Sequence, residues 1–504
     1  MAQDAIQSYL NKTKPEEINS GFLAYIANLT ESAKVAPEIT KLIVKELADQ
    51  RSNLKLIASE NYSSLSTQLA MGNLLTDKYA EGYARHRFYA GCDNVDDIEI
   101  YACEQACNLF GCEHAYVQPH SGADANLVAY WAILNTKIEV PSLAELGVTD
   151  PNKLSVEDWN KLRHKLGNQR LFGMDYYSGG HLTHGYRHNV SAQMFEAYSY
   201  SVNKESGLLD YDELEKKATE IKPLILLAGF SAYPRKINFR RLREIADNVG
   251  AVLMVDMAHF AGLVAAGVFE GDFNPVIHAQ VVTTTTHKTL RGPRGGMVLC
   301  TNEFAEAVDK GCPLVIGGPL PHVMAAKAIA LKEANQPEFK AYGRKIIENA
   351  QTLAQNCIDL GMTVATGGTD NHLFLIDVRS FGLTGRQAES ALRDCCITLN
   401  RNSLPFDPNG PWYTSGLRIG TPAVTTLGMN PADMKTIAEI IKLVLSNTQP
   451  AQIESGKNAG ELSKAKYEID PVAQNEAKTK LKKLLDVFPV YPQLDLEFLQ
   501  EYFG

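Results

Sequence analysis

Residues 281–296 read VVTTTTHKTLRGPRGG, a threonine-rich run followed by a glycine-rich one. The first part is β-branched and half apolar, which is typical of a buried strand, whereas Arg291 to Gly296 is typical of a tight loop. Lys288 is therefore predicted at the end of a strand. A lysine there usually points into water. In a partly desolvated pocket it would instead lose its proton more readily and attack a carbonyl.

Short apolar runs of the same kind recur between about residues 100 and 330, separated by helical stretches. They are HAYVQP (114–119), KPLILLAGF (222–230), GAVLMVDMAHFAGLVAAG (250–267), AQVVTTTTHK (279–288) and GGMVLCT (295–301). Strands that alternate with helices indicate a parallel sheet. We therefore expect an α/β fold with a mostly parallel sheet.

The length of 504 residues suggests more than one domain. We expect an N-terminal helical arm over 1–70, a large domain over 71–340 and a smaller α+β domain over 341–504. Two polar stretches interrupt the pattern, and we expect 137–170 to be a surface insertion and 449–480 a solvated excursion.

Composition argues against several classes of protein. A net charge of -9 and a pI near 5.8 disfavour a nucleic-acid surface. The nine cysteines lack paired metal-binding spacings and are expected to be free thiols in a reducing cytosol. Neither a signal peptide nor a long uncharged apolar stretch is evident, so we expect a cytoplasmic protein that does not cross a membrane.

The stretch QPHSGADAN (118–126) is a candidate phosphate site. It places Ser121, Gly122 and Ala123 after a short strand and before a helical run, where free N–H groups and the helix dipole favour an anion. Taken by itself, the same stretch is more often a serine N-cap with a turn glycine.

Asp256 ends an apolar run, three residues before His259. A buried carboxylate requires a cationic or hydrogen-bonding partner. It suits the protonated ring nitrogen of pyridoxal phosphate, a cofactor that a strand-end lysine holds through a Schiff base. Capping of the next helix is an equally good interpretation.

The stretch SGGHLTHGYRH (178–188) carries His181, His184 and His188. Their spacing is compatible with metal ligands on a helix, but the glycines favour a loop and no acidic ligand is evident, so we predict no metal. A histidine ring stacked on a flat cofactor fits a glycine-rich loop better.

The stretch DKYAEGYARHRFYAG (77–91) mixes Tyr79, Glu81 and Tyr89 with basic residues. Such a mixture also occurs in single-strand nucleic-acid sites, but the acidic run that follows disfavours one. A carboxylate among tyrosines is a plausible proton donor and acceptor, and a polar interface loop is the simpler alternative.

Arg418 lies between apolar neighbours in SGLRIGTPAVTT (415–426). A guanidinium there suits bidentate recognition of a substrate carboxylate. Pairing with a structural acid explains the same pattern, and both interpretations stay open.

Together, these stretches occur in the order found in serine hydroxymethyltransferase, a fold-type I pyridoxal-phosphate enzyme, which the chain resembles from about residue 20 to 448 and again at VFPVYP (487–492). LIASENY (56–62) and AGFSAYPR (228–235) belong to the same series. The resemblance implies a three-layer αβα large domain. It also implies transfer of a hydroxymethyl group from serine to tetrahydrofolate, with glycine as product.

The resemblance assigns roles residue by residue. Lys288 would hold the cofactor, Asp256 would pair with the pyridine nitrogen and His181 would stack on the ring. Near the ring hydroxyl and the phosphate it places His259, Ser231, Ser121, Gly122, Ala123 and His287, with Tyr79 and Gly318 from the partner subunit of a homodimer. For the substrate carboxylate and the proton transfers it places Arg418, Ser59, Glu81 and Tyr89, and for the folate Gly180, Leu182 and Asn402.

The chain differs from the usual family pattern on the folate and interface sides. The differing positions are Ala84, Arg85, Phe88, Tyr176, Tyr177, Ser178, Leu314 and Ile316. Two alternatives therefore stand beside the transferase: a folate-independent aldolase for β-hydroxy amino acids such as allo-threonine, with an alanine racemase side activity, and a non-catalytic scaffold with RNA affinity. The intact trio Lys288, Asp256 and Arg418 argues against the scaffold. Whether dimers pair into tetramers stays open.

Overall fold

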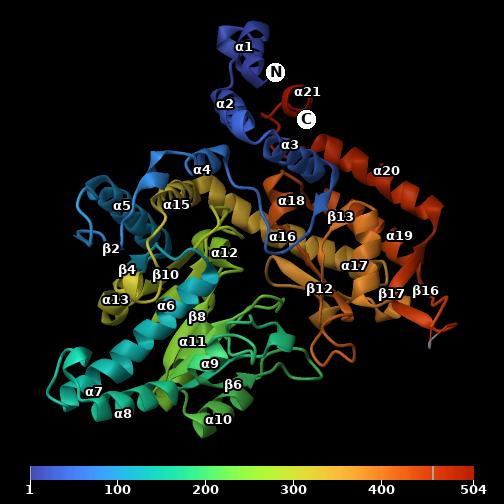
Figure 1. The fold of residues 1–504 in the computed structure, drawn as a ribbon. Coiled ribbons are helices and arrows are strands. Elements are labelled where there is room, and N and C mark those ends of the chain that lie inside the picture. The colour runs from blue at the N-terminus through green and yellow to red at the C-terminus, as the bar shows by residue number, and fades with distance from the viewer. Residues whose placement is uncertain (1, 457–458) are drawn as a thin grey trace.

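The computed structural model describes residues 2–456 and 459–504, and its largest element is a seven-stranded sheet (Figure 1). The strand order is β4-β10-β9-β8-β7-β5-β6. The strands are β4 (His114–Tyr116), β5 (Arg170–Met174), β6 (Glu196–Tyr200), β7 (Ile225–Gly229), β8 (Val252–Asp256), β9 (Val281–Thr285) and β10 (Gly296–Cys300). The predicted α/β class is confirmed.

Most neighbouring strands in this sheet are parallel, and one strand, β10, runs in the opposite direction to its two neighbours. The pairs β5–β6, β5–β7, β7–β8 and β8–β9 are parallel, whereas β10 is antiparallel to both β9 and β4. The expectation that GGMVLCT forms a further parallel strand was therefore wrong. Only a loop separates β9 from β10, where the Thr286 N–H donates to the Gly295 carbonyl, and a parallel pair needs a longer crossover.

The side chains of the strands alternate between the two faces of the sheet. Each face is buried in a hydrophobic cluster that it forms with helices. Leu226, Leu253 and Val282 belong to the hydrophobic cluster on one face, while Leu227 and Met254 belong to the cluster on the other. Helices α5 (Asp93–Phe110), α10 (Tyr211–Ile221), α11 (Phe239–Val249), α12 (Ala261–Ala265) and α15 (Pro321–Ala334) contribute to the first cluster, and α6 (Gly122–Leu134) and α13 (Asn302–Asp309) to the second. The architecture is three-layered, with strands that are apolar throughout because both faces are covered.

A second hydrophobic core forms around a four-stranded antiparallel sheet in the order β11-β12-β15-β14. Its strands are β11 (Thr363–Val364), β12 (Leu373–Asp377), β14 (Asn400–Asn402) and β15 (Gly416–Gly420), and its helices are α16 (Pro337–Asp359), α17 (Gly385–Asp394), α19 (Pro431–Ser446) and α20 (Pro471–Val487). Strand β1 (Leu54–Lys55) pairs with β13 (Ile397–Thr398), so this piece of the expected helical arm lies in the second core. The reason is that Leu54 and Leu56 are both fully buried there.

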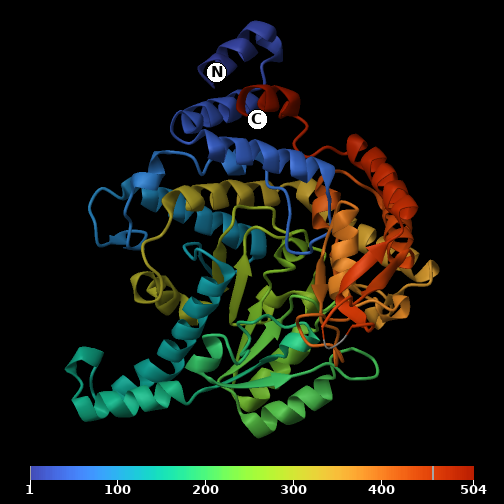
Figure 2. The same cartoon turned by 45° about the vertical axis from the view of Figure 1, so that its right-hand side comes forward.

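The first helices and the last one share a third, smaller core. Helices α1 (Ala2–Lys12), α2 (Ser20–Val35) and α3 (Pro37–Ser52) pack with α21 (Leu496–Phe503), so both termini lie at the same end of the molecule (Figure 2). The Phe22 and Phe498 rings meet edge to face, with their centroids 5.8 Å apart. The last helix therefore joins the N-terminal helices rather than the second core.

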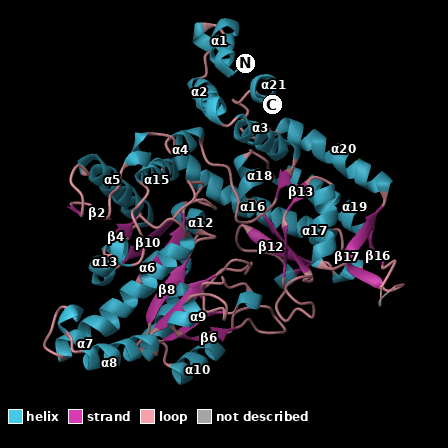
Figure 3. Ribbon diagram, in the orientation of Figure 1, coloured by secondary structure: helices cyan, strands magenta, loops and turns pink. Residues whose placement is uncertain are grey.

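The two polar stretches contain regular secondary structure within the residues that the structure describes. Helices α7 (Val140–Glu145) and α8 (Val156–Gly167) form most of 137–170 and project from the body (Figures 2 and 3), held by Leu143 and Leu162, which are buried. Strands β16 (Thr448–Gln452) and β17 (Leu462–Ile469) form a ribbon. Residues 471–480 are not a solvated excursion, because they begin α20, where Ala477 is fully buried. The predicted domain boundaries stay predictions.

Candidate functional site

Two adjoining cavities open at the edge of the large sheet where the parallel strands β7, β8 and β9 end. Their volumes are about 350 and 360 Å³. Both are lined by Ser59, His181, Ser231, His259 and Lys288. The carboxyl edge of an open α/β sheet is where such folds bind ligands. The five shared residues come from stretches far apart in the sequence, and the fold brings them together as one site.

Lys288 reaches this site from the loop after β9. Its Nζ donates to Thr285 Oγ1 at 3.1 Å, and its carbonyl accepts a hydrogen bond from Asn61 Nδ2 at 3.0 Å. Burial lowers the pKa of Lys288 to about 8, against the opposing effect of Asp256. A lysine with this pKa is partly unprotonated near neutral pH and therefore nucleophilic. Lys288 is therefore not a strand-end lysine that points into water, which was the other interpretation of the sequence.

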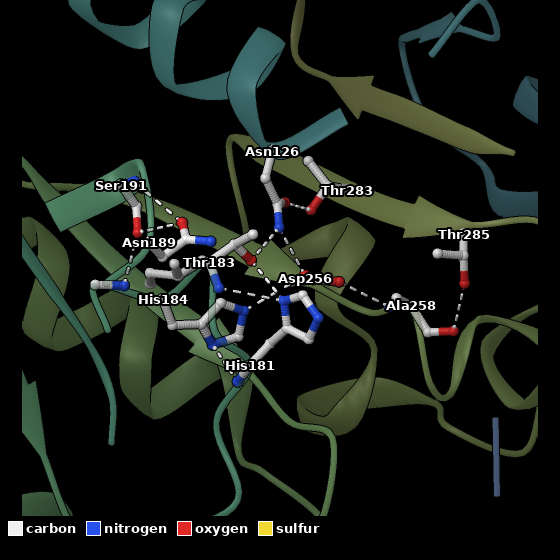
Figure 4. A network of polar contacts seen from close by, with 12 residues as sticks. Asn126, His181, Thr183, His184, Asn189, Ser191, Asp256, Ala258, Thr283 and Thr285 are labelled. Atoms are coloured by element: carbon white, nitrogen blue, oxygen red, sulfur yellow. Dashed lines mark hydrogen bonds and ion pairs between the residues drawn. The ribbon is translucent and has the colours of Figure 1, made fainter. Parts of the chain in front are cut away.

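Asp256 ends β8 and is buried under a network of donors (Figure 4). Its Oδ2 accepts from Asn126 Nδ2 at 2.9 Å and lies 3.4 Å from His184 Nε2, and its Oδ1 accepts from the Ala258 N–H at 3.0 Å. Burial alone would raise the pKa of Asp256, but the contacts with His184, His181 and Asn126 hold it well below its usual range. Asp256 is thus a carboxylate, able to partner a protonated ring nitrogen.

The three histidines of 178–188 separate into different environments. His181 lines both cavities, with its Nδ1 2.7 Å from Thr183 Oγ1, whereas His184 lines only the first and contacts Asp256. His188 turns outward beside the Tyr186 ring. Burial lowers the pKa of His181 to about 4, so its ring is neutral at physiological pH. Among the described residues, no group of three or more His, Cys, Asp or Glu side chains is placed to hold a metal.

The candidate phosphate cradle lies at the start of α6. Ser121 is the N-cap, its Oγ accepts from the Asp124 N–H at 3.2 Å, and Ser121, Gly122 and Ala123 line the first cavity with His287. The Nδ1 atom of His287 is buried without a hydrogen-bond partner in the described structure. A Cβ on Gly122 would lie 2.7 Å from Thr285 Cγ2, so the glycine keeps this wall open. Unpaired donors at a helix N-terminus fit a phosphate.

His259 and Ser231 belong to the wall that the two cavities share. His259 Nδ1 lies 3.2 Å from Nε2 of His372, a buried residue that the sequence patterns did not single out. Burial lowers the pKa of His259 well below its usual value and that of His372 to about 3, so both rings are neutral. The Ser231 N–H donates to the Gly179 carbonyl at 2.7 Å, which ties this wall to the glycine loop of His181.

Arg418 projects from β15 into the second cavity. Its Nη1 donates to the Ser231 carbonyl at 2.6 Å and its Nε to Asn400 Oδ1 at 3.0 Å. Burial lowers the pKa of Arg418 to about 10, which leaves it charged at neutral pH. No acidic side chain forms an ion pair with it among the described residues. Pairing with a structural acid is therefore excluded within this part of the chain, and its charge faces the cavity.

The predicted folate residues line the same second cavity. Gly180, Leu182 and Asn402 are among its lining residues, together with Tyr176 and Arg401. A Cβ on Gly180 would lie 2.1 Å from the Met174 carbonyl oxygen, so the loop packs against the end of β5 only with glycine there. Tyr176, one of the differing positions, stacks obliquely against Tyr186 with ring centroids 5.2 Å apart.

Four predicted site residues lie elsewhere in this chain. Tyr79, Glu81 and Tyr89 gather around the small hairpin β2 (Gly82–Tyr83) and β3 (His86–Arg87), where Tyr89 OH donates to Glu81 Oε2 at 3.2 Å. An added Cβ on Gly318 would lie 3.5 Å from the Tyr79 ring. The Tyr79 side chain is 60% exposed. None of the four lines either cavity.

The amino-acid sequence also matches a family of known proteins. The family model described as "Serine hydroxymethyltransferase" matches residues 32–147 and 164–441. The chain belongs to the serine hydroxymethyltransferase family. The protein of that name from Treponema pallidum (strain Nichols) is 61% identical over 503 residues, covering 100% of this chain and 87% of that protein. Those from Mycolicibacterium smegmatis and Chlamydia trachomatis serovar L2 are 58% and 51% identical, over 94% and 97% of this chain and 95% and 98% of theirs.

Family membership confirms the resemblance drawn from the motifs. The break in the family match at 148–163 falls within the α7–α8 projection. The family is pyridoxal-phosphate dependent, and the side chains present fit that group: a nucleophilic lysine, a buried carboxylate, and a helix N-terminus beside the unpaired Nδ1 of His287. The patterns missed Asn126, His184, Thr183 and His372. For His184 the available signal was its place in the glycine-rich histidine stretch, whereas Asn126 was quoted only as the end of the cradle motif.

Proposed function

We propose that this site transfers a hydroxymethyl group reversibly between serine and tetrahydrofolate, with glycine and 5,10-methylenetetrahydrofolate as the other pair. The observation that carries the proposal is the convergence of Lys288, Asp256 and Arg418 on adjoining cavities that share a wall. An amine, a carboxylate and a guanidinium in these positions suit a carbonyl cofactor bound on one side and an amino acid carboxylate on the other. The relatives' shared name supports the choice of reaction.

The residues of the first cavity would bind the cofactor, and Arg418 in the second would bind the substrate. Pyridoxal phosphate, when bound, supplies a conjugated ring that accepts the electron pair released at the substrate α-carbon. Lys288 would hold it, Asp256 would keep a proton on its pyridine nitrogen, and Ser121, Gly122 and His287 would hold its phosphate. Arg418 would bind the substrate carboxylate with its remaining donors, because Nε and Nη1 are occupied.

The proton transfers need an available carboxylate, and the two that line the first cavity are already engaged: Asp256 in its buried hydrogen-bond network and Glu60 in an ion pair with Lys55 at 3.0 Å. Glu81 is the predicted group, and its pairing with Tyr89 lies outside both cavities of its own chain. We infer that Glu81, Tyr79, Tyr89 and Gly318 complete the site of a second copy in a homodimer. Support comes from the exposure of Tyr79, Tyr89 and Phe88, which are 60%, 45% and 69% exposed, and from the contact between the Tyr79 and Tyr89 rings, whose centroids are 5.2 Å apart.

The reaction is tested by spectroscopy and by product analysis. The purified holoenzyme with glycine should develop a long-wavelength absorbance band that grows when tetrahydrofolate is added, and a Lys288→Gln variant should not turn over. Serine should yield glycine only with tetrahydrofolate present. A protein that cleaves allo-threonine but forms glycine from serine at a folate-independent rate would overturn the proposal in favour of the aldolase.

The shared site is tested by subunit complementation. Lys288→Ala and Glu81→Gln are prepared as separate inactive proteins, then mixed under conditions that exchange subunits. If each site takes Lys288 from one chain and Glu81 from the other, every mixed dimer contains one intact site and activity reappears. Mixtures that exchange subunits but stay inactive would show that both residues act within one chain.

A further inference from the structure

A pair of thiols lies at the end of α5, outside both cavities of the functional site. The helix ends at Gly111, whose φ of 70° is left-handed and whose N–H donates to the Cys107 carbonyl at 2.8 Å. Glycine adopts this conformation without the steric cost that a Cβ brings. The chain reverses direction at Gly111, which brings Cys112 back beside the last helical turn. There, Cys112 Sγ donates to Cys107 Sγ at 3.7 Å.

The two thiols are both half-buried, but only Cys107 lines a surface hollow. Cys107 lines a surface hollow of about 480 Å³ together with Cys103, Glu104, His114 and Asp309, whereas Cys112 is not among its lining residues. A small reagent in the hollow therefore meets Cys107 first. Cys112 lies next to it, placed to react second.

The surroundings favour a negative charge on Cys107. The hydrogen bond from Cys112 lowers the pKa of Cys107 to about 7, against burial and Glu104, and the nearby His114 ring acts in the same direction. His114 lies 2.8 Å from Asp309, which raises the pKa of His114 against burial. By contrast, burial raises the pKa of Cys103 well above its usual value. Thiolates, not thiols, are the reactive form.

We propose that Cys107 and Cys112 are a peroxide-reactive pair that closes to an intramolecular disulfide. The Cys107 thiolate attacks one oxygen of hydrogen peroxide, the O–O bond breaks and hydroxide leaves, giving a sulfenic acid on Cys107. Cys112 sulfur then attacks that sulfur, and the sulfenic oxygen leaves as water with the Cys112 proton. In sum, two thiols and one hydrogen peroxide give one disulfide and two waters. Closure to the S–S bond length of about 2.05 Å needs the two sulfurs to approach by roughly 1.7 Å.

The sequence itself provides a clean assay. Cleavage after glutamate separates residues 100–104 (IYACE), which carry Cys103, from 105–113 (QACNLFGCE), which carry only Cys107 and Cys112. The reduced holoenzyme is treated with a small excess of hydrogen peroxide, alkylated after denaturation, digested without reductant and weighed by mass spectrometry. We expect peptide 105–113 to lose two hydrogens and take no alkyl group, while peptide 100–104 stays fully alkylated.

Two variants separate the steps. Cys112→Ser should stop at the sulfenic acid, which a cyclic 1,3-diketone traps on Cys107, and Cys107→Ser should abolish disulfide formation in this peptide. Wild-type protein in which 105–113 remains doubly alkylated after peroxide has oxidised Cys103 would overturn the proposal. Equal oxidation rates at Cys103 and Cys107 would overturn it as well. Neither result depends on the folding of a variant or on the transferase activity.

Discussion

Asn126 and Asp256, 130 residues apart, are joined by a buried hydrogen bond of 2.9 Å from Nδ2 to Oδ2. The orientation of the amide is fixed, because Asn126 Oδ1 accepts a hydrogen bond from Thr283 Oγ1 at 2.5 Å. Helix α6 and strands β8 and β9 are thus locked around one carboxylate (Figure 4). The contact holds Asp256 as an acceptor only, which is the state that a protonated pyridine nitrogen requires.

Asp256→Asn should reduce kcat by about 10²- to 10³-fold, a typical loss for one preorganised electrostatic contact. The new amide also puts an NH₂ group against a donor in either orientation, Asn126 Nδ2 on one side or the Ala258 N–H on the other. We therefore expect a free energy of unfolding lower by about 1–3 kcal/mol. Turnover and denaturant unfolding check both, with exposed Asp247→Asn as the control. Near-normal kcat in a folded variant would contradict the role given to Asp256.

Arg418→Lys should raise the KM for serine by roughly 10- to 100-fold, because an ammonium cannot present the planar fork of a guanidinium. Cofactor binding should persist, since Arg418 lines the second cavity and not the first. Steady-state kinetics and the absorbance of the bound cofactor measure the two effects. An unchanged KM would show that the substrate carboxylate binds elsewhere.

Capture of pyridoxal phosphate by the cofactor-free protein should accelerate with rising pH and level off above about 8, the lowered pKa of Lys288. The unprotonated amine is the nucleophile, and an unshifted lysine would continue to gain rate beyond about pH 10. Between these pH values the folded protein binds fewer protons at Lys288 than the unfolded chain does. The Lys288 contribution to the free energy of unfolding therefore rises with pH across this window. Stopped-flow absorbance locates the midpoint, and a midpoint near 10 would contradict the desolvated environment.

Lys327→Met should weaken binding of pyridoxal phosphate and lower the free energy of unfolding by about 1–3 kcal/mol. Lys327 Nζ is fully buried on α15 and donates to the carbonyls of Val117, Pro119 and Gly296, at 2.6, 2.9 and 2.8 Å. These carbonyls flank the chain that leads to Ser121. Cofactor titration and unfolding measure the effect, with exposed Lys332→Met on the same helix as control. Equal behaviour of the two variants would refute a positioning role for Lys327.

Local sequence patterns were sufficient to predict most strands of the large sheet and the polar residues that follow them. Asp256 and Lys288 were identified because buried parallel strands are short apolar runs, and the polar residues that follow such runs meet at one edge of the sheet. Strand β10 was misassigned because periodicity does not encode strand direction. Leu54 packs in the second core and α21 in the third, and local patterns do not indicate this because sequence adjacency does not show which core receives a side chain.

The sequence by itself determined the α/β class, the order of the motifs and the family, since these depend on residue type and spacing along one chain. Only the tertiary structure decided which groups meet: Asn126 and His184 on Asp256, His372 on His259, and Cys112 on Cys107. It also placed Glu81 and Tyr89 outside both cavities of their own chain. The physical reason is that burial, hydrogen-bond partners and pKa values depend on distances between segments remote in sequence, and those distances exist only after the chain has folded.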